Sequence, residues 1–193
     1  MYDLFFRKLN ELEPLSDKEL DLMSSFLTTK KLRRKQYLLQ EGDICKYLAF
    51  VESGALKSYS IDAKGAEHIL QFALEGWIIS DLYSFLTGEQ SSYHIQALED
   101  CQLVLISQQA HEELLQQVPT YETYIRLQIT NAYIALQRRL HFVQSLTAEE
   151  RYKNLLALQP GIVQRVPQHM IASYMGLTPE TLSRIRRKIA DQQ

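Results

Sequence analysis

The chain has 193 residues, enough for one large or two small domains, and its 46% hydrophobic content supports a real core. A formal net charge of −2 at pH 7 excludes a general polyanion-binding protein on composition alone. The two cysteines, Cys45 and Cys101, have no zinc-ligand spacing, and no apolar run approaches the ~20 residues of a membrane span. Because the N-terminal stretch lacks the apolar core of a signal peptide, we expect a cytoplasmic protein with free thiols and no membrane partner.

Short strands are predicted over about residues 30–108. Five glycines recur at intervals of 11 or 12 residues, namely Gly42, Gly54, Gly65, Gly76 and Gly88. Strand-forming runs lie between and after them, at 47–51, 56–61, 68–72, 93–98 and 102–106. Short strands with turns at this spacing indicate an all-β barrel, sandwich or roll. A helix over 17–27, with Ser16 as its cap, is predicted to precede the strands.

A long helix is predicted from about Thr120 to Leu146. Its apolar residues recur at spacings of three and four, with Ile125, Ile129, Ala132, Leu136 and Val143 among them. This near-heptad stripe is typical of a seam between two helices, so we expect a homodimer. A helix lying on its own domain would explain the stripe as well. Thr147 is predicted to cap the next helix, and 162–166 to form a short strand.

The segment 168–189 has the pattern of a helix-turn-helix. A first helix over 168–174 is followed by Gly176 at the turn, and Thr178-Pro179 can cap and start the second helix. Residues 147–193 carry 7 Lys/Arg against 4 Asp/Glu, whereas residues 1–146 carry 14 against 19. Two short crossed helices with a cationic second helix are typical of a DNA-reading module. An ordinary pair of packed helices remains the alternative.

The order of these elements resembles that of the Crp/Fnr family of bacterial transcription regulators. Residues 41–77 resemble the family's cyclic-nucleotide-type β-roll, and 178–189 resemble its recognition helix. The resemblance implies an α+β fold with three parts: a double-stranded, jelly-roll-like β-roll with flanking helices (1–119), a long dimerisation helix (120–146) and a C-terminal (winged) helix-turn-helix domain (147–193). Only four residues follow Ile189, so we expect the wing strands to be missing.

The resemblance implies a homodimeric, sequence-specific regulator that binds an inverted repeat in double-stranded DNA, with RNA polymerase as a further partner. In the family a Glu, a Ser three residues on and the next Arg read base edges, and these fall here on Glu180, Ser183 and Arg184. Pro179 stands where some members have an additional Arg. The candidate DNA-binding residues are Gln168, Thr178, Glu180, Ser183, Arg184 and Arg187. An ordinary salt bridge between Glu180 and Arg184 is the plainer interpretation of that pair.

The effector pocket departs from the family pattern. The Gly-Glu pair that holds the ribose falls on Ser80-Asp81, and the Arg that neutralises the cyclic phosphate falls on Ser91. No Lys or Arg lies between Lys64 and Arg126, so we expect cyclic AMP not to bind. An unidentified small-molecule effector is left open, with a candidate pocket of Gly76, Asp81, Leu82, Ser91 and Ser92.

No cofactor is firmly expected. Residues 1–30 lack the cysteine cluster of the family's iron–sulfur sensors, and haem ligation by His68, His94 or Cys101 is less favoured than an ordinary strand role. The sequence shows no nucleophile–base pattern, metal spacing or phosphate loop of an enzyme. The alternative to a DNA-binding regulator is a small-molecule-binding module that acts through protein partners without productive DNA binding.

Overall fold

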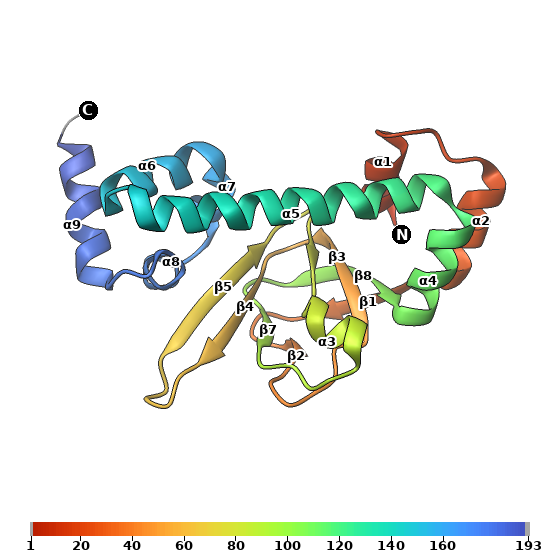
Figure 1. The fold of residues 1–193 in the computed structure, drawn as a ribbon, viewed down its shortest axis with the longest axis horizontal. Coiled ribbons are helices and arrows are strands. Elements are labelled where there is room, and N and C mark those ends of the chain that lie inside the picture. The colour runs from red at the N-terminus through yellow and green to blue at the C-terminus, as the bar shows by residue number, and fades with distance from the viewer. Residues whose placement is uncertain (1, 192–193) are drawn as a thin grey trace.

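The computed structural model describes residues 2–191. Figure 1 shows a β-roll beneath a long helix, with one group of helices at each end of that long helix. The N-terminal helices lie at one end and the C-terminal helices at the other, so the long helix connects the two ends of the molecule.

The β-roll contains the strands β1 (Thr28–Leu32), β2 (Tyr37–Leu39), β3 (Tyr47–Ser53), β4 (Leu56–Ile61), β5 (Glu67–Ala73), β6 (Ile78–Ile79), β7 (His94–Ala97) and β8 (Cys101–Ser107). Within the described residues they form two antiparallel four-stranded sheets, ordered β1-β8-β3-β6 and β2-β7-β4-β5. The pairing of β3 with β8 places Ala49 opposite Leu105 and buries both. The predicted roll of short strands is therefore confirmed.

Gly54, between β3 and β4, has to be a glycine for two reasons. Its φ of +97° lies in the left-handed region, and a Cβ at this position would lie 2.5 Å from the carbonyl oxygen of Asp100. The close approach lets Leu98 N–H donate to the Ala55 carbonyl at 2.8 Å. The tight turn after β3 thus packs directly against the turn that joins β7 to β8.

The helices α1 (Asp3–Asn10), α2 (Asp17–Phe26), α3 (Leu82–Thr87) and α4 (Gln108–Gln117) flank the roll. Ser16 caps α2 as predicted: its hydroxyl accepts from Glu19 N–H, and its own N–H donates to the Glu19 carboxylate at 2.8 Å. On α1, Phe5 is fully buried and its ring centroid lies 5.1 Å from that of Phe50 on β3. Aromatic packing of this kind fixes α1 on the roll.

The long helix α5 (Pro119–Ser145) starts with proline at its first turn, where the missing N–H costs no hydrogen bond. Its first turns, with Tyr121 and Tyr124, are buried in the core of the roll. Ile125 is buried there too, with 5% of its surface exposed, although the sequence pattern placed it in the same seam as Ile129. Beyond residue 128 most side chains are exposed. No helix in the described part of the chain, α5 included, has the length and apolarity to cross a bilayer.

The C-terminal helices are α6 (Ala148–Leu158), α7 (Pro160–Arg165), α8 (Gln168–Met175) and α9 (Pro179–Ala190). The prediction of a strand over 162–166 was wrong, because this segment is α7 and its C-cap. Ile162 and Val166 are both buried, and their spacing of four puts them on one side of a helical turn. Within residues 2–191 no strand follows β8, so no wing strand is present there.

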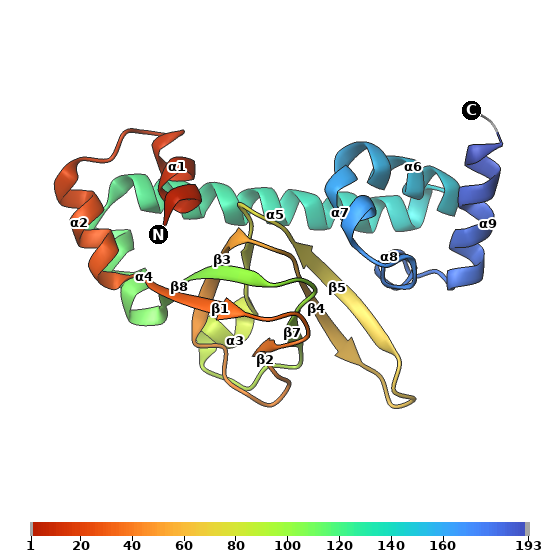
Figure 2. The same ribbon diagram turned by 180° about the vertical axis from the view of Figure 1, so that it is seen from behind.

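The C-terminal helices pack on the roll through α8, which lies beside β5 in both views (Figures 1 and 2). Ser173 makes two hydrogen bonds to the β5 backbone. Its hydroxyl donates to the Glu67 carbonyl at 2.7 Å and accepts from Ile69 N–H at 3.1 Å. A helix side chain therefore completes the hydrogen bonding of the sheet edge at this point.

Candidate nucleic-acid interface

The turn between α8 and α9 has the backbone that the sequence predicted. Gly176 has a φ of +67°, and the N–H of Leu177 donates to the Ala172 carbonyl at 2.9 Å, which closes the end of α8. Thr178 then caps α9, with its hydroxyl accepting from Thr181 N–H at 3.3 Å. The role of Thr178 in the structure is therefore to start the helix.

The inner side of α9 packs against α6 and α8. Leu182 is buried, and Ile185 and Ile189 are partly buried against the same cluster. This second core contains Tyr152, Leu155, Ile162, Val166, Ile171, Ala172 and Met175. The apolar stripe fixes which side of α9 faces outward.

The outward side of α9 carries Glu180, Ser183, Arg184 and Arg187, and all four are exposed. They lie at spacings of three and four, so they share one side of the helix. Gln168 is exposed as well, at the first position of α8. Side chains of these types can hydrogen-bond to base edges and to phosphates in a major groove.

Glu180 and Arg184 are not joined by an ion pair: between residues 2 and 191 the salt bridges involve other groups. The Arg184 guanidinium instead donates to the Thr181 hydroxyl at 3.3 Å. The pKa of Glu180 is lowered, first by the backbone amide at the helix start, then by the Thr178 hydroxyl and the charge of Arg184. Both side chains are exposed on the outward side of α9.

Lys188, on the same helix, forms an intramolecular ion pair. Its ammonium lies 2.6 Å from the Glu149 carboxylate on α6. Lys153 pairs with the same carboxylate, and the two ammonium groups lower the pKa of Glu149 to about 2. This contact ties the end of α9 to α6, and it sets Lys188 apart from the outward cations.

In the predicted effector pocket, Asp81 and Ser91 come together and satisfy each other. The Ser91 hydroxyl donates to one Asp81 oxygen at 2.7 Å, and the other oxygen accepts from Ser84 N–H at 3.1 Å, which caps α3. Asp81, Ser84 and Ser91 are all buried. Both carboxylate oxygens are therefore occupied by partners within the chain.

The other three residues of that predicted pocket are not drawn into this contact. Gly76 lies beside α1, since a Cβ at its position would be 3.7 Å from the Lys8 side chain. Leu82 and Ser92 are exposed. The structure thus joins two of the five predicted pocket residues.

The exposed half of α5 carries large apolar side chains. Leu136 is 62% exposed, and Ile129, Tyr133, Leu140 and Val143 are each at least half exposed. Ala132 is also exposed. A helix with this much uncovered apolar surface normally has a partner.

Two arginines connect the C-terminal helices to the roll, and the sequence analysis did not predict this role for them. Arg139 on α5 donates to the Leu70 carbonyl at 2.7 Å and to the Tyr174 carbonyl at 2.8 Å, and stacks on the Tyr174 ring at 4.1 Å. Arg165 pairs with Glu75 and Glu99, with closest N–O distances of 2.6 Å. Their partners lie 35 to 90 residues away in the chain, so no local pattern announces them.

Comparisons with known proteins agree with the observed fold of β-roll, long helix and C-terminal helices. The cyclic nucleotide-binding domain family matches residues 29–118, which cover the β-roll and α4. The fumarate and nitrate reduction regulatory protein of Vibrio cholerae serotype O1 is 29% identical over 183 residues, covering 89% of this chain and 72% of that protein. The anaerobic regulatory protein of Haemophilus influenzae is 26% identical, covering 89% of this chain and 70% of that protein. These relatives are named as regulatory proteins, in keeping with the expectation that the chain is not an enzyme.

A solved structure shares the whole architecture. The c-di-GMP responsive global regulator CLP of Xanthomonas campestris superposes with a TM-score of 0.72 at 17% identity, covering 92% of this chain and 93% of that chain. At this identity the likeness concerns the fold. The order of β-roll, long helix and C-terminal helices is therefore shared with a known regulator.

Proposed function

We propose that this chain is a DNA-binding transcription regulator of the Crp/Fnr type, and that it acts as a homodimer on an inverted-repeat operator, with a sensor domain that does not accept cyclic AMP. The observation that carries the proposal is the outward side of α9, where Glu180, Ser183, Arg184 and Arg187 are exposed on a helix whose other side is fixed in a core.

Base readout is assigned to the first turns of α9. Arg184 can form two hydrogen bonds to guanine, and Glu180 can accept from the amino group of cytosine. Ser183 reaches a base or a phosphate, whereas Arg187, Thr178 and Gln168 fit contacts to the flanking backbone. The Pro179 position contributes no side-chain charge, so the operator is read without a cation there.

Dimerisation is assigned to the exposed half of α5. Ile129, Ala132, Leu136 and Val143 form the predicted seam, and their exposure in the single chain supports it. Ile125 is left out because its own core covers it. The corresponding division of the chain is 1–119 for the sensor domain, 120–146 for the dimerisation helix and 147–193 for the DNA-binding domain.

The predicted effector pocket lacks a cation for a cyclic phosphate, because Ser91 stands at the position of the family's Arg. The Asp81–Ser91 hydrogen bond occupies the position where the family binds ribose and phosphate. An iron–sulfur cluster does not fit this chain either. Four thiolates usually hold such a cluster, whereas the chain has two cysteines, both buried and unpaired. Among residues 2–191 no group of three or more His, Cys, Asp or Glu side chains could hold a metal ion.

The test is selection of bound sequences from random DNA by the full-length protein. We expect enrichment of an inverted repeat whose half-sites lie about one helical turn, ~34 Å, apart. The double variant Glu180→Ala/Arg184→Ala should lose the enrichment while it keeps its circular dichroism spectrum. Failure of the unaltered protein to enrich any sequence would refute the proposal.

The alternative function is a small-molecule sensor that works through protein partners without productive DNA binding. The exposed cations of α9 and the names of the relatives favour the DNA-binding function. Binding to DNA that does not weaken with rising salt, or no binding at all, would favour the alternative.

A further inference from the structure

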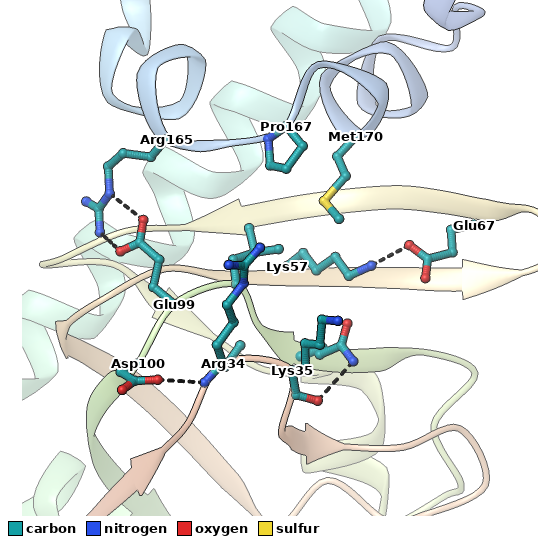
Figure 3. A pocket seen from close by; sticks show the side chains of 12 residues that line it. Arg34, Lys35, Lys57, Glu67, Glu99, Asp100, Arg165, Pro167 and Met170 are labelled. Atoms are coloured by element: carbon teal, nitrogen blue, oxygen red, sulfur yellow. Dashed lines mark hydrogen bonds and ion pairs between the residues drawn. The ribbon is translucent and has the colours of Figure 1, made fainter.

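A cavity of about 630 Å³ lies between the β-roll and the segment that joins α7 to α8. Arg34, Lys57 and Gln96 line it from the roll, and Arg165, Pro167 and Met170 from the C-terminal helices (Figure 3). Neither Asp81 nor Ser91 lines it, so it is distinct from the predicted effector pocket. Its volume falls within the ~300–1,000 Å³ that small-molecule sites usually have.

Two of the cations that line the cavity are already neutralised. Lys57 is 1% exposed; its ammonium pairs with the Glu67 carboxylate and lies 3.9 Å from the centroid of the Tyr59 ring. Arg165 donates to the Glu99 carboxylate from Nε at 3.0 Å and from Nη2 at 2.6 Å. These pairs form the walls of the cavity and leave little charge for a ligand.

Arg34 and Lys35 differ, because their side-chain cations have no hydrogen-bond or ion-pair partner among residues 2–191. Their backbone is nonetheless held in place. Arg34 N–H donates to the Asp100 carboxylate and Lys35 N–H to the Ala97 carbonyl, both at 2.8 Å. In Figure 3 the Arg34 side chain extends from this turn into the cavity, toward Pro167. The cavity thus presents unpaired positive charge on a fixed backbone.

The remaining lining is partly apolar, with Leu98, Pro167 and Met170. We propose that the cavity binds a small organic anion, one carboxylate or phosphate group on an apolar body. The anionic group pairs with Arg34 and Lys35, since guanidinium and ammonium donors form their strongest hydrogen bonds with such oxygens. The apolar body lies against Pro167 and Met170. The nearby carboxylates of Glu99 and Asp100 disfavour a second anionic group.

A ligand in this position contacts the roll and the C-terminal helices at once. It therefore binds the arrangement in which the two are packed together and stabilises that arrangement. Binding at this site does not depend on the proposed DNA-binding function, and its test uses no DNA.

The experiment follows the nuclear magnetic resonance signal of the Met170 methyl group, because Met170 lines the cavity. In the full-length protein labelled with ¹³C at the methionine methyl groups, phenyl phosphate and phenylacetate are titrated separately, with benzyl alcohol as the neutral control. We expect the Met170 methyl resonance to shift in a saturable way with at least one anion, while that of Met23, which is fully buried in the roll, stays in place. A response to only one of the anions identifies a phosphate or a carboxylate as the group recognised.

Matched variants test the anchor. Arg34→Gln should weaken the anion about tenfold or more, as loss of a charge-assisted hydrogen bond requires. Arg33→Gln removes the neighbouring exposed cation, which does not line the cavity, and should leave the affinity unchanged. An unshifted Met23 resonance verifies that each variant is folded. No Met170 response to either anion, equal binding of benzyl alcohol, or equal weakening by both variants would overturn the proposal.

Discussion

The Ser91 hydroxyl donates a hydrogen bond of 2.7 Å to Asp81, so that two buried polar groups satisfy each other where a nucleotide-binding relative would need a cation and a free carboxylate. Opening this pair for a ligand would leave a buried carboxylate oxygen without a partner, which is costly. The hydrogen bond therefore supports the proposal that this position does not accept a cyclic phosphate.

We predict that cyclic AMP does not bind tightly to the protein. Titration calorimetry should give no saturable heat in the range of a ~1 µM dissociation constant, which corresponds to about −8.2 kcal/mol. Saturable binding in that range, lost in Asp81→Asn, would contradict our interpretation of the pocket.

We predict that charged substitutions in the apolar seam of α5 convert the dimer to monomers. Ile129→Glu together with Leu136→Glu should give particles of 22.5 kDa in sedimentation, against twice that mass for the unaltered protein. Each replacement would bury a carboxylate in an apolar interface. Leu158→Glu, which alters an equally exposed leucine outside the seam, is the control and should not change the mass. A monomeric unaltered protein would count against the seam.

Arg184 and Arg187 should respond differently to removal. Arg184→Ala should cost ~1–3 kcal/mol on the selected operator and relax discrimination at one G·C pair. Arg187→Ala should weaken all sequences alike and reduce the slope of log affinity against log salt by about one. Fluorescence anisotropy on operator and scrambled DNA over a salt series separates the two. Equal losses on both DNAs for both variants would reduce Arg184 to an electrostatic contact.

Arg139 should hold the C-terminal helices on the roll. Arg139→Ala removes two hydrogen bonds from a charged donor and a stacking contact. Amide hydrogen exchange over α8 should speed up about tenfold or more, since hydrogen bonds to charged groups contribute ~1.5–3 kcal/mol each. Arg138→Ala, at the adjacent exposed position, is the matched control and should exchange like the unaltered protein. Unchanged exchange in Arg139→Ala would show that the packing of α8 on β5 suffices.

His111 should make stability depend on pH. Its Nδ1 lies 2.8 Å from the Tyr121 hydroxyl, and burial lowers the pKa of His111 below its ordinary value. The unfolded chain therefore takes up the proton at a higher pH than the folded one does. Its contribution to stability is complete above about pH 6.5 and declines as the pH falls below that value.

The melting temperature should thus fall between about pH 7 and pH 5, and His111→Gln should flatten that fall. His169→Gln alters an exposed histidine on α8 and should keep the slope of the unaltered protein. Identical slopes for His111→Gln and the unaltered protein would contradict the assignment.

The sequence alone determined the turns, the helix caps and the polar side of α9, because these depend on residues close together in the chain. The glycines at Gly54 and Gly176 and the caps at Ser16 and Thr178 could be read in advance, because turns and helix starts depend on residues a few positions apart. The outward side of α9 followed from the same reasoning, since helical periodicity separates its apolar stripe from its polar residues. The prediction of a strand over 162–166 failed because five residues are too few to distinguish the period of a strand, two residues, from that of a helix, 3.6 residues.

Only the tertiary structure determined which distant parts of the chain contact one another. Ile125 and Ile129 belong to one stripe in the sequence, yet the roll covers the first and leaves the second exposed. Arg139 and Arg165 find their partners only when α8 packs beside β5. The cavity near Arg34 exists only where residues between 34 and 100 meet residues 165–170. Periodicity reports which side of an element is apolar, whereas the identity of its neighbour depends on how distant elements pack.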